Sequence, residues 1–406
     1  MTNEAIFPPP RCPMRPLDPP PDLMRMSAEG GATRIRQWNG VEAWVFTRYD
    51  DVKSALVDKR LSADPTRPGF PEKSAAYSQI LGKDRNLRTM DDPEHATQKR
   101  MLLQDFSVKR VEEMRPAIKA RVESLLDAMI KKGPPSEFVS DFALSIPTMV
   151  ICEILGIPYK DRDFFSALSQ DCVSSEVSAD VAAKAGKELY TYLDNLMAQK
   201  DKHPENDLLS RLVVEQIRSG LLTRKDAVEL ARLILIGGHE TTANMISLST
   251  LALLRNPDQL ELLKTNIDNP AFLSNAVDEL FRFVSVTHNG RRRVAVEEVL
   301  IGKQLVKVGE GVILLNNVAD RDELIFPSAD KLDLSRKNAN THLAFAAGIH
   351  RCLGATLSKC EMELVHGAIW KRLPNLALAT PFEQLQFNEG ATVFSIKAMP
   401  LTWTTV

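Results

Sequence analysis

The sequence predicts a mainly α-helical protein with small β-sheets, an α+β fold. Residues 108–212 show helical periodicity that is interrupted by Pro, Gly and Asp. A second apolar pattern runs from Thr223 to Arg255, roughly 32 residues or about 48 Å of helix. Short segments of β-forming residues lie near residues 35–47, 294–312 and 389–404. Helices should therefore form most of the core, with the strands in small sheets.

Composition narrows the class of protein. The chain has 406 residues, 44% of them hydrophobic, so it can bury a large core. Its net charge of −2 gives no indication of nucleic acid or of an anionic membrane as partner. Five irregularly spaced cysteines indicate a reducing compartment rather than a disulfide framework. We find no signal-peptide pattern and no apolar run of about 20 residues, so we expect a soluble, cytoplasmic protein.

The first part of the chain predicts an arm followed by a small β-structure. Residues 1–23 contain eight prolines, which predicts an extended arm with little structure of its own. Residues 35–47 predict a β-hairpin with a two-residue turn at Asn39-Gly40. A helix should follow from Tyr49 to Val57. The Pro-, Ser- and Gly-rich segment from Arg60 to Ser78 predicts a long loop of the kind that carries binding residues.

The next segments are helical. A helix should begin near Asp91, with His95 and Lys99 four residues apart on one face, where both can donate to one anion. A solvated basic helix face explains these two residues equally well. Residues 108–212 should form four or five amphipathic helices.

The long helix has an unusual centre. Thr223 and Asp226 predict its N-cap, and apolar residues all round it predict burial. Residues 237–242 read Gly-Gly-His-Glu-Thr-Thr, and two interior glycines need a reason such as close approach by something flat. A buried Glu beside two Thr is costly unless it is paired or solvated. Zinc is disfavoured because Ala243 stands where a second His ligand would be needed.

A cysteine loop completes the set of unusual features. Cys352 lies in the decapeptide from Phe345 to Gly354, a glycine-bearing loop that leads into a helix predicted from Ala355 to Lys371. A thiolate there would be stabilised by backbone N–H groups and the helix N-terminus. Taken alone, Cys352 would be interpreted as a buried apolar cysteine.

The whole decapeptide resembles the haem-binding loop of the cytochrome P-450 family, where the Cys thiolate is the axial iron ligand. One position departs from the family pattern. The family usually has Gly where Ala346 stands, so we expect a φ at Ala346 that a Cβ tolerates.

The resemblance covers most of the chain and implies a single cytochrome P-450 domain over residues 24–406, with haem b between the long helix and the cysteine loop. It implies an iron ligand, an oxygen-activating acid and alcohol pair, and a set of haem contacts: Cys352; Glu240 and Thr241; His95, Lys99, Arg293, Phe345, His350 and Gly354. Lys99 replaces the family's Arg, which keeps the charge and loses the bidentate fork.

Two further groups follow from the resemblance. Glu279 and Arg282 match a structural Glu-x-x-Arg pair joined by Arg336, although a pair at this spacing is more often a solvated salt bridge. Asp320 stands where the family has Asn. The substrate pocket is expected to include residues of the long helix, of residues 286–289 and of a closing hairpin predicted over Glu389–Thr404: Ile236, Gly237, Val286, Val393 and Phe394.

The implied function is a haem-thiolate monooxygenase that inserts one oxygen atom from O2 into a small to medium apolar organic substrate. Electrons would come from NAD(P)H through a separate ferredoxin and ferredoxin reductase, and the protein would be a monomer. The surface cations that could steer an acidic ferredoxin, or be plain surface charge, are Arg100, Lys109, Arg110, Arg351 and Lys359.

Two alternatives differ in chemistry. A nitric oxide reductase of the fungal kind would take electrons directly from NADH, and Glu240 counts against it because that branch lacks an acid there. A non-enzymatic haem-thiolate sensor would need no acid and alcohol pair.

Overall fold

The computed structural model describes residues 7–72, 86–173 and 177–405. It confirms the mainly α-helical prediction, with small sheets. The chain divides into two compact units, each built from two separate stretches of sequence: unit 1 is Met1–Ala96 with Asp278–Cys352, and unit 2 is Thr97–Val277 with Leu353–Val406. The prediction of a single domain over 24–406 stays a prediction. No helix within the described part of the chain is long and apolar enough to span a membrane.

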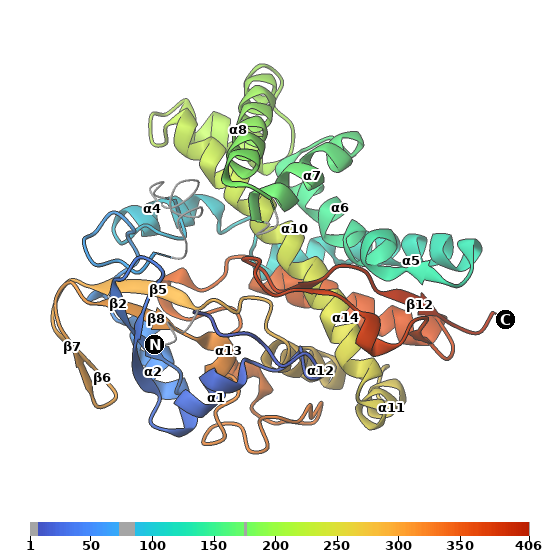
Figure 1. Ribbon diagram of the computed structural model, residues 1–406. Coiled ribbons are helices and arrows are strands. Elements are labelled where there is room, and N and C mark those ends of the chain that lie inside the picture. The colour runs from blue at the N-terminus through green and yellow to red at the C-terminus, as the bar shows by residue number, and fades with distance from the viewer. Residues whose placement is uncertain (1–6, 73–85, 174–176, 406) are drawn as a thin grey trace. The chain divides into compact units, whose positions relative to one another are not determined.

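Unit 1 is organised around a five-stranded sheet in the order β1-β2-β8-β5-β3 (Figure 1). The pairing of β2 with β8 is parallel, with Ala43 opposite Gly311, and the other pairings are antiparallel. The strands of unit 1, with the separate hairpin β6–β7, are β1 (Ala32–Arg36), β2 (Glu42–Phe46), β3 (Leu61–Ser62), β5 (Arg291–Ala295), β6 (Val299–Ile301), β7 (Gln304–Val306) and β8 (Gly311–Leu314).

The helices of unit 1 are short. Helix α2 has the predicted bounds, and the 3-10 segment η5 lies in the cysteine loop. The set comprises α1 (Pro21–Ala28), α2 (Tyr49–Val57), α13 (Asn316–Ala319), η4 (Ala339–Thr341) and η5 (Gly348–His350), while α4 (Glu94–Leu102) and α12 (Pro270–Phe283) cross the boundary with unit 2.

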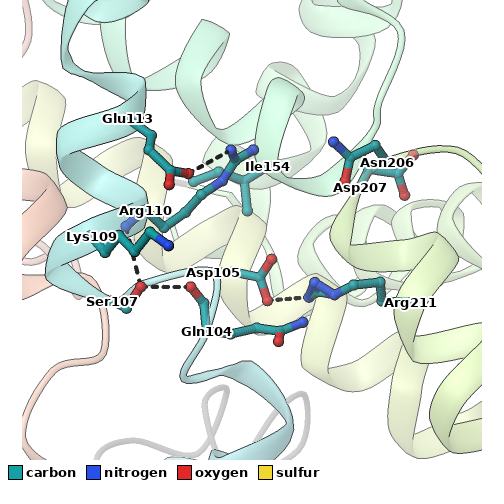
Figure 2. Close-up of a pocket in the computed structure, with 10 residues that line it drawn as sticks. All are labelled: Gln104, Asp105, Ser107, Lys109, Arg110, Glu113, Ile154, Asn206, Asp207 and Arg211. Carbon is teal, nitrogen blue, oxygen red and sulfur yellow. Dashed lines mark hydrogen bonds and ion pairs between the residues drawn. The ribbon is translucent and has the colours of Figure 1, made fainter.

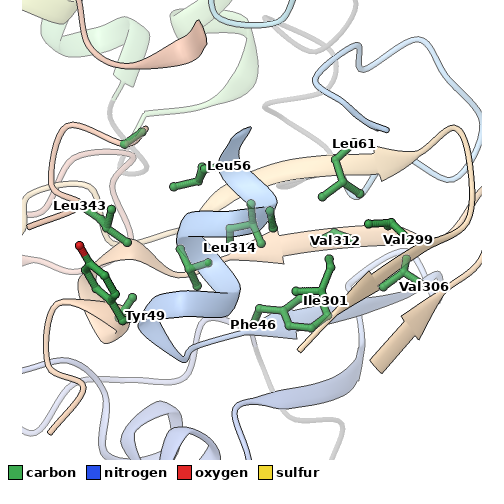
Figure 3. Close-up of a cluster of buried hydrophobic side chains, with 14 of the residues drawn as sticks. Phe46, Tyr49, Leu56, Leu61, Val299, Ile301, Val306, Val312, Leu314 and Leu343 are labelled. Atoms are coloured by element: carbon green, nitrogen blue, oxygen red, sulfur yellow. The ribbon is translucent and has the colours of Figure 1, made fainter. Parts of the chain in front are cut away.

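The core of unit 1 lies between α2 and the sheet (Figure 3). Phe46, Val312 and Leu314 from the strands are fully buried against Tyr49 and Leu56 from α2. The same cluster contains Leu343 and Ala346, which precede the cysteine. Apolar burial, at about 25 cal/mol per Å², therefore anchors the start of the cysteine loop to the sheet.

The hairpin β1–β2 has a different turn from the one predicted. The N–H of Gln37 donates to the carbonyl of Val41 at 2.9 Å, which leaves three loop residues, Trp38 to Gly40. The N–H of Gly40 donates back to the Gln37 carbonyl at 2.9 Å, and Gly40 has a φ of 79°. This is the three-residue loop in which a turn is followed by a left-handed glycine. The two-residue turn at Asn39-Gly40 was wrong because Gly40 serves as that third residue.

The N-terminal arm ends earlier than Leu23. Helix α1 begins at Pro21, a proline in its first turn, and Leu23 is fully buried. Before it, Arg11 donates from Nη1 to the carbonyls of Pro16 and Asp18, at 3.0 and 2.7 Å. The described part of the arm is thus held by side-chain hydrogen bonds, and burial of Leu23 adds the first helix to unit 1.

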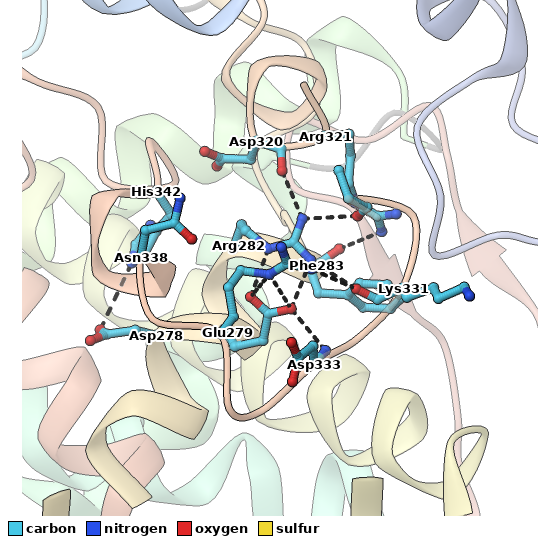
Figure 4. A network of polar contacts seen from close by, with 12 residues as sticks. Asp278, Glu279, Arg282, Phe283, Asp320, Arg321, Lys331, Asp333, Asn338 and His342 are labelled. Atoms are coloured by element: carbon cyan, nitrogen blue, oxygen red, sulfur yellow. Dashed lines mark hydrogen bonds and ion pairs between the residues drawn. The ribbon is translucent and has the colours of Figure 1, made fainter. Parts of the chain in front are cut away.

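A buried polar network joins α12 to the irregular segment that precedes the cysteine loop (Figure 4). Arg282 donates to the Glu279 carboxylate from Nε and Nη2, at 2.7 and 2.8 Å, and Arg336 Nε lies 3.1 Å from the same group. Arg282 also donates to three carbonyls of the segment, those of Asp320, Ala329 and Lys331. Irregular backbone can be buried here because charged side chains satisfy its carbonyls.

Asp320 is a buried acid in the same region. Its Oδ1 accepts a 2.7 Å hydrogen bond from the N–H of Leu343, while its Oδ2 has no hydrogen-bond partner among the described residues. Burial raises the pKa of Asp320 to about 8, and the Leu343 N–H, Arg282 and Arg321 act in the opposite direction. The family's Asn would accept the same hydrogen bond without this ionisation.

Unit 2 is helical, and α10 is its longest helix (Figure 1). Thr223 caps α10 by accepting from the N–H of Asp226, as predicted, and the helix contacts α6, α8 and α14. The other helices of this unit include α5 (Val108–Lys132), α6 (Ser145–Leu155), α7 (Arg162–Val173), α8 (Ala179–Lys202), α9 (Leu208–Arg211), α10 (Arg224–Leu254), α11 (Pro257–Thr265) and α14 (Ala355–Arg372), with π-helical segments η1 (Val139–Ala143) and η3 (Leu212–Ile217) and 3-10 segments η2 (Tyr159–Asp161) and η6 (Phe382–Gln384).

The C-terminal strands correct one prediction. Strand β10 (Phe387–Asn388) pairs with β11 (Ser395–Ile396), whereas β12 (Pro400–Thr402) lies between β4 (Ser136–Glu137) and β9 (Ala377–Leu378). A single closing hairpin over Glu389–Thr404 was therefore wrong. The change of partner gives β12 two neighbours, and Leu401 is fully buried there.

The Glu279 network gives the first prediction. Glu279→Ala leaves two buried guanidinium groups without their carboxylate, so it should lower the free energy of unfolding by about 3–5 kcal/mol. Asp22→Ala is the control, because Asp22 pairs with Arg25 at the same i, i+3 spacing on the exposed face of α1, where a pair contributes about 0–1 kcal/mol. Equal losses in urea unfolding of the two variants would contradict a structural role for Glu279.

Asp320 gives a prediction with a defined pH window. A folded-state pKa raised from 3.8 to about 8 means that the folded protein binds the extra proton, so this acid should lower stability as pH rises from about 4 to about 8, by up to about 1.4 kcal/mol per pH unit. Asp320→Asn should flatten that fall and make the variant the more stable protein at pH 8. Asp330→Asn, the same change at an exposed position, should follow wild type. Parallel wild-type and Asp320→Asn curves, measured by thermal unfolding from pH 5 to pH 8, would contradict the assignment.

Candidate functional site

The cysteine loop in unit 1 has two residues in the left-handed region. Gly348 has a φ of 69°, and a Cβ there would lie 3.0 Å from the carbonyl oxygen of Leu56 in α2. Ala346 has a φ of 57°, so the expectation of a φ that a Cβ tolerates was wrong. The left-handed turn costs a residue with a Cβ about 1–2 kcal/mol. The hydrogen bond from the Cys352 N–H to the Phe345 carbonyl, at 2.9 Å, closes this turn.

Exposure separates Cys352 from the other cysteines. All five are described and none forms a disulfide, and Cys352 is the exposed one. Burial raises the pKa of Cys152 and of Cys360 to about 12, so both remain thiols at neutral pH. Cys352 is therefore the cysteine that can offer a thiolate to a metal.

Cationic and imidazole groups gather in the same unit. The His95 and His350 rings lie 4.5 Å apart between centroids. Arg293 is nearly fully buried, and burial, with repulsion from Arg291 and Arg88, lowers its pKa to about 10 although Asp91 opposes the shift. A buried guanidinium and two imidazoles are donors that suit carboxylates.

Phe345 lies between two rings in this unit. Its ring centroid is 4.7 Å from that of Phe281 and 5.6 Å from that of His342. Unit 1 therefore supplies the exposed Cys352 thiol, the buried Arg293 guanidinium, the imidazoles of His95 and His350, and the Phe345 ring. These are the groups that the iron and the two carboxylates of a haem require, so the residues fit that cofactor. Lys99, on α4 one turn beyond His95, and Gly354, the residue before α14, belong to unit 2.

Helix α10 leaves one stripe accessible. Most of its residues are buried, but Leu233, Ile236 and Thr241 are half-buried and Gly237 is exposed, all within one side of the helix. A Cβ at Gly237 would meet nothing within 4 Å. The stripe is a surface at which a flat group or a substrate can lie against the helix.

The second glycine serves a different purpose. A Cβ at Gly238 would lie 3.0 Å from Cδ1 of Ile151 in α6. The prediction that both glycines admit something flat is therefore wrong for Gly238, which allows α6 and α10 to pack closely.

Thr241 lies on this stripe, and the buried Glu240 precedes it in α10. The Thr241 hydroxyl donates to the Gly237 carbonyl at 2.5 Å and holds its side chain along the helix. Burial raises the pKa of Glu240 to about 7, and the nearby Asn244 amide acts in the opposite direction. The pair thus presents an alcohol and an acid that can hold or release a proton near neutral pH.

His239 was considered in the sequence only as a zinc ligand. In the structure it is fully buried, and its Nε2 lies 3.4 Å from the hydroxyl of Ser166 in α7. No local pattern could predict this contact, because the two residues are 73 positions apart.

The tentative pocket residues divide between the units. Ile236 and Gly237 lie on the accessible stripe of α10, whereas Val286 is buried in unit 1. In unit 2, Val393 is half-buried, and Phe394 is buried with its ring stacked on Phe387 at 5.7 Å. The adjoining strand β11 contacts α10.

A separate polar pocket of about 370 Å³ lies in unit 2 (Figure 2). Its lining residues are Gln104, Asp105, Ser107, Lys109, Arg110, Glu113, Ile154, Asn206, Asp207 and Arg211. Several of these charges pair among themselves: Asp105 with Arg211, and Arg110 with Glu113 at 3.5 Å. None of the predicted catalytic residues lines this pocket. It does contain Lys109 and Arg110, two of the cations considered for ferredoxin steering, in a setting of balanced charge.

Comparison with known proteins finds a matching family model and similar relatives. Residues 164–374 match the family model described as Cytochrome P450. The chain is 40% identical to cytochrome P450-SU2 of Streptomyces griseolus (97% of this chain, 96% of the relative) and 41% identical to pentalenic acid synthase of Streptomyces avermitilis (96% and 95%).

Solved structures are similar to this chain over nearly its whole length. The crystal structure of GfsF has a TM-score of 0.90 at 37% identity, over 98% of this chain and 100% of that one. The mycinamicin VIII C21 methyl hydroxylase MycCI of Micromonospora griseorubida, bound to mycinamicin VIII, has a TM-score of 0.90 at 34% identity, again over 98% and 100%.

The left-handed Ala346 gives a prediction on stability. Ala346→Gly should relieve the turn and, after the entropy that glycine adds to the unfolded chain, raise the free energy of unfolding by about 0.5–1 kcal/mol. Gly348→Ala is the matched opposite change, and it should lower stability because a Cβ would approach the Leu56 carbonyl. Thermal unfolding of both variants checks this. A loss of stability in Ala346→Gly would mean that the turn is not strained.

Proposed function

The chain belongs to the cytochrome P450 family, and we propose that Cys352, Glu240 and Thr241 carry its monooxygenase reaction on a small to medium apolar organic substrate. The observation that carries the proposal is the position of Glu240: a buried carboxyl whose pKa is raised to about 7, next to an alcohol on the accessible stripe of α10. An acid of this kind can deliver protons at the pH of a cell.

The family's cofactor is a haem-thiolate, and we assign the iron ligand to Cys352 because it is the exposed cysteine. When bound, the haem supplies the metal at which dioxygen is activated. Arg293, His95 and His350 would hold its carboxylates, together with Lys99, and Phe345 and Gly354 would contact the ring. The proposal that the cofactor is haem b follows from this set, because no cysteine pattern for covalent attachment occurs in the chain.

The chain's own residues account for proton delivery. Glu240 can take a proton from the solvent side and give it towards the stripe. The Thr241 hydroxyl is held by the Gly237 carbonyl, and rotation about its Cα–Cβ bond would let it donate to a group lying on the stripe instead. Apolar neighbours such as Leu233 and Ile236 limit the water that reaches this face, so protons arrive by this route.

Electron supply is a second part of the proposal. The chain has neither a flavin motif nor the cysteine spacing of an iron–sulfur cluster, so electrons from NAD(P)H would arrive through a separate ferredoxin and ferredoxin reductase. Arg351, next to the cysteine, is exposed and is the best placed of the predicted cations for an acidic partner. The charges around Lys109 and Arg110 are balanced locally, which makes them weaker candidates.

The substrate is assigned only by class. Relatives of this chain include a vitamin D3 dihydroxylase of Streptomyces griseolus and the mycinamicin VIII hydroxylase named above, two hydroxylases with different organic substrates. The apolar side chains of the α10 stripe suit molecules of this kind. Neither the reductase nor the sensor alternative is named among the relatives described.

The experiment separates the two roles. Thr241→Ala should still bind substrate and consume oxygen, but release hydrogen peroxide in place of product. Glu240→Gln removes the proton source and should slow the whole cycle by about 10²–10⁴-fold. The measurement is product and peroxide formed per NAD(P)H oxidised, with a surrogate ferredoxin and reductase.

Thr242→Ala is the matched control. The Thr242 hydroxyl is one residue further along α10 and donates to Ser358 of α14 at 3.2 Å, away from the stripe. Its coupling should equal that of wild type. Full coupling in Thr241→Ala, or normal turnover in Glu240→Gln, would remove the corresponding role.

A further inference from the structure

His239 lies between the predicted acid and helix α7. Its Nδ1 is 3.5 Å from Oε1 of Glu240, and its Nε2 is 3.4 Å from the hydroxyl of Ser166. The Phe165 ring makes an edge-to-face contact with the His239 ring, with 6.3 Å between the centroids. Neither His239 Nδ1 nor Glu240 Oε1 has a hydrogen-bond partner among the described residues. Two buried polar atoms therefore face each other at slightly more than hydrogen-bond distance.

The hydrogen on the ring decides whether this approach is favourable. Burial lowers the pKa of His239 to about 4, so the ring is neutral at working pH and carries one hydrogen. If that hydrogen is on Nε2, the Nδ1 lone pair faces an ionised carboxylate and repels it. If it is on Nδ1, it points at Glu240 Oε1, and Nε2 can accept from the Ser166 hydroxyl. The second arrangement satisfies all three side chains while Glu240 is ionised.

We propose that His239 is a positioning residue for Glu240, which its Nδ1–H holds in the ionised form, and that Ser166 fixes the ring tautomer that makes this possible. The inference rests on the proposed role of Glu240 and extends it to α7. In the absence of this donor, the carboxylate would lose its nearest stabilising partner, and the carboxyl would stay protonated to higher pH. His239 thus sets the pH at which Glu240 releases its proton.

Among the described residues, no charged side chain contributes to the pKa of His239 or of Glu240. Burial lowers the pKa of His239. Burial raises the pKa of Glu240, and the Asn244 amide opposes that rise. The titratable groups on the elements packed against α10 contribute to neither pKa; among them are Asp141, Cys152, Cys172, Tyr190, Tyr192, Glu215, Cys360, Glu361 and His366.

The test replaces His239 with Asn, Gln or Leu in the holoenzyme. The Asn amide reaches the place of Nδ1, the longer Gln amide reaches that of Nε2, and Leu supplies neither. The infrared band of the protonated Glu240 carboxyl, assigned by its loss in Glu240→Gln, is titrated against pH in the resting protein. This readout does not depend on turnover. The pH profile of coupled product formation is then compared with it.

We expect His239→Leu and His239→Gln to raise the midpoint of the carboxyl titration by about one pH unit, and His239→Asn to keep it near wild type. Ser166→Ala should raise the midpoint by less, because the His239 ring keeps its Nδ1 but no longer has a preferred tautomer. Ser169→Ala is the control on α7: its buried hydroxyl has no hydrogen-bond partner among the described residues, so the midpoint should not move. The pH profile of turnover should shift in step with the titration.

An unchanged midpoint in His239→Leu, or equal shifts in the Asn and Leu variants, would overturn the inference. If His239→Leu does not fold, the comparison of Asn with Gln decides it. Failure of the underlying proposal has a different signature, because normal turnover in Glu240→Gln would remove the role of the acid whatever the titration of the His239 variants shows.

Discussion

The carboxylate of Glu279 is the constraint on which the cysteine loop depends. Two guanidinium groups, of Arg282 and Arg336, share it, and both also donate to carbonyls of the irregular segment over residues 320–336. A segment without regular structure cannot satisfy its own backbone, so burial is possible only when side chains do so. The loop that carries Cys352 follows this irregular segment in the sequence. Its position is set by this network on one side and by the apolar contacts of Leu343 and Ala346 on the other.

Three buried carboxyl groups differ in how many hydrogen-bond donors they have. Glu279 accepts hydrogen bonds from Arg282, from Arg336 and from the N–H of Asp333. Asp320 has only one good donor for its oxygens, and burial raises its pKa to about 8. Glu240 has a pKa raised to about 7 and faces an imidazole. The number of donors at each carboxylate distinguishes a structural anion from an acid that can exchange a proton near neutral pH.

The sequence predicted best where the signals are local. Helix α2 has the predicted bounds, and the N-cap of α10 is at Thr223, because a capping hydroxyl and a 3.6-residue pattern act over a few residues. The fold class and the family followed from such signals and from the cysteine decapeptide. Two of the predicted donors of unit 1, His95 and His350, lie near each other, with 4.5 Å between their ring centroids. Their roles towards a haem are still a proposal.

What the sequence could not predict depends on partners far away in the chain. The glycine at 238 is required by Ile151 of another helix, and β12 pairs with β4 and β9 rather than with its neighbour in sequence. The left-handed φ of Ala346 is imposed by the closure of the loop, and it opposes the local preference of alanine. The contact of His239 with Ser166 exists only after α7 and α10 have packed, so no local pattern predicts it.

The order of strands in unit 1 has a consequence for the growing chain on the ribosome. Strand β2 is complete at Phe46, but its parallel neighbour β8 ends at Leu314. At about 5–20 residues per second, translation would leave that edge of the β1–β2 hairpin without its partner for on the order of tens of seconds. Helix α2 is synthesised directly after β2 and can cover its apolar residues during this time. The N-terminal third of unit 1 therefore spends this time as a nascent fragment with an unpaired strand edge, which is a site for aggregation until β8 is made.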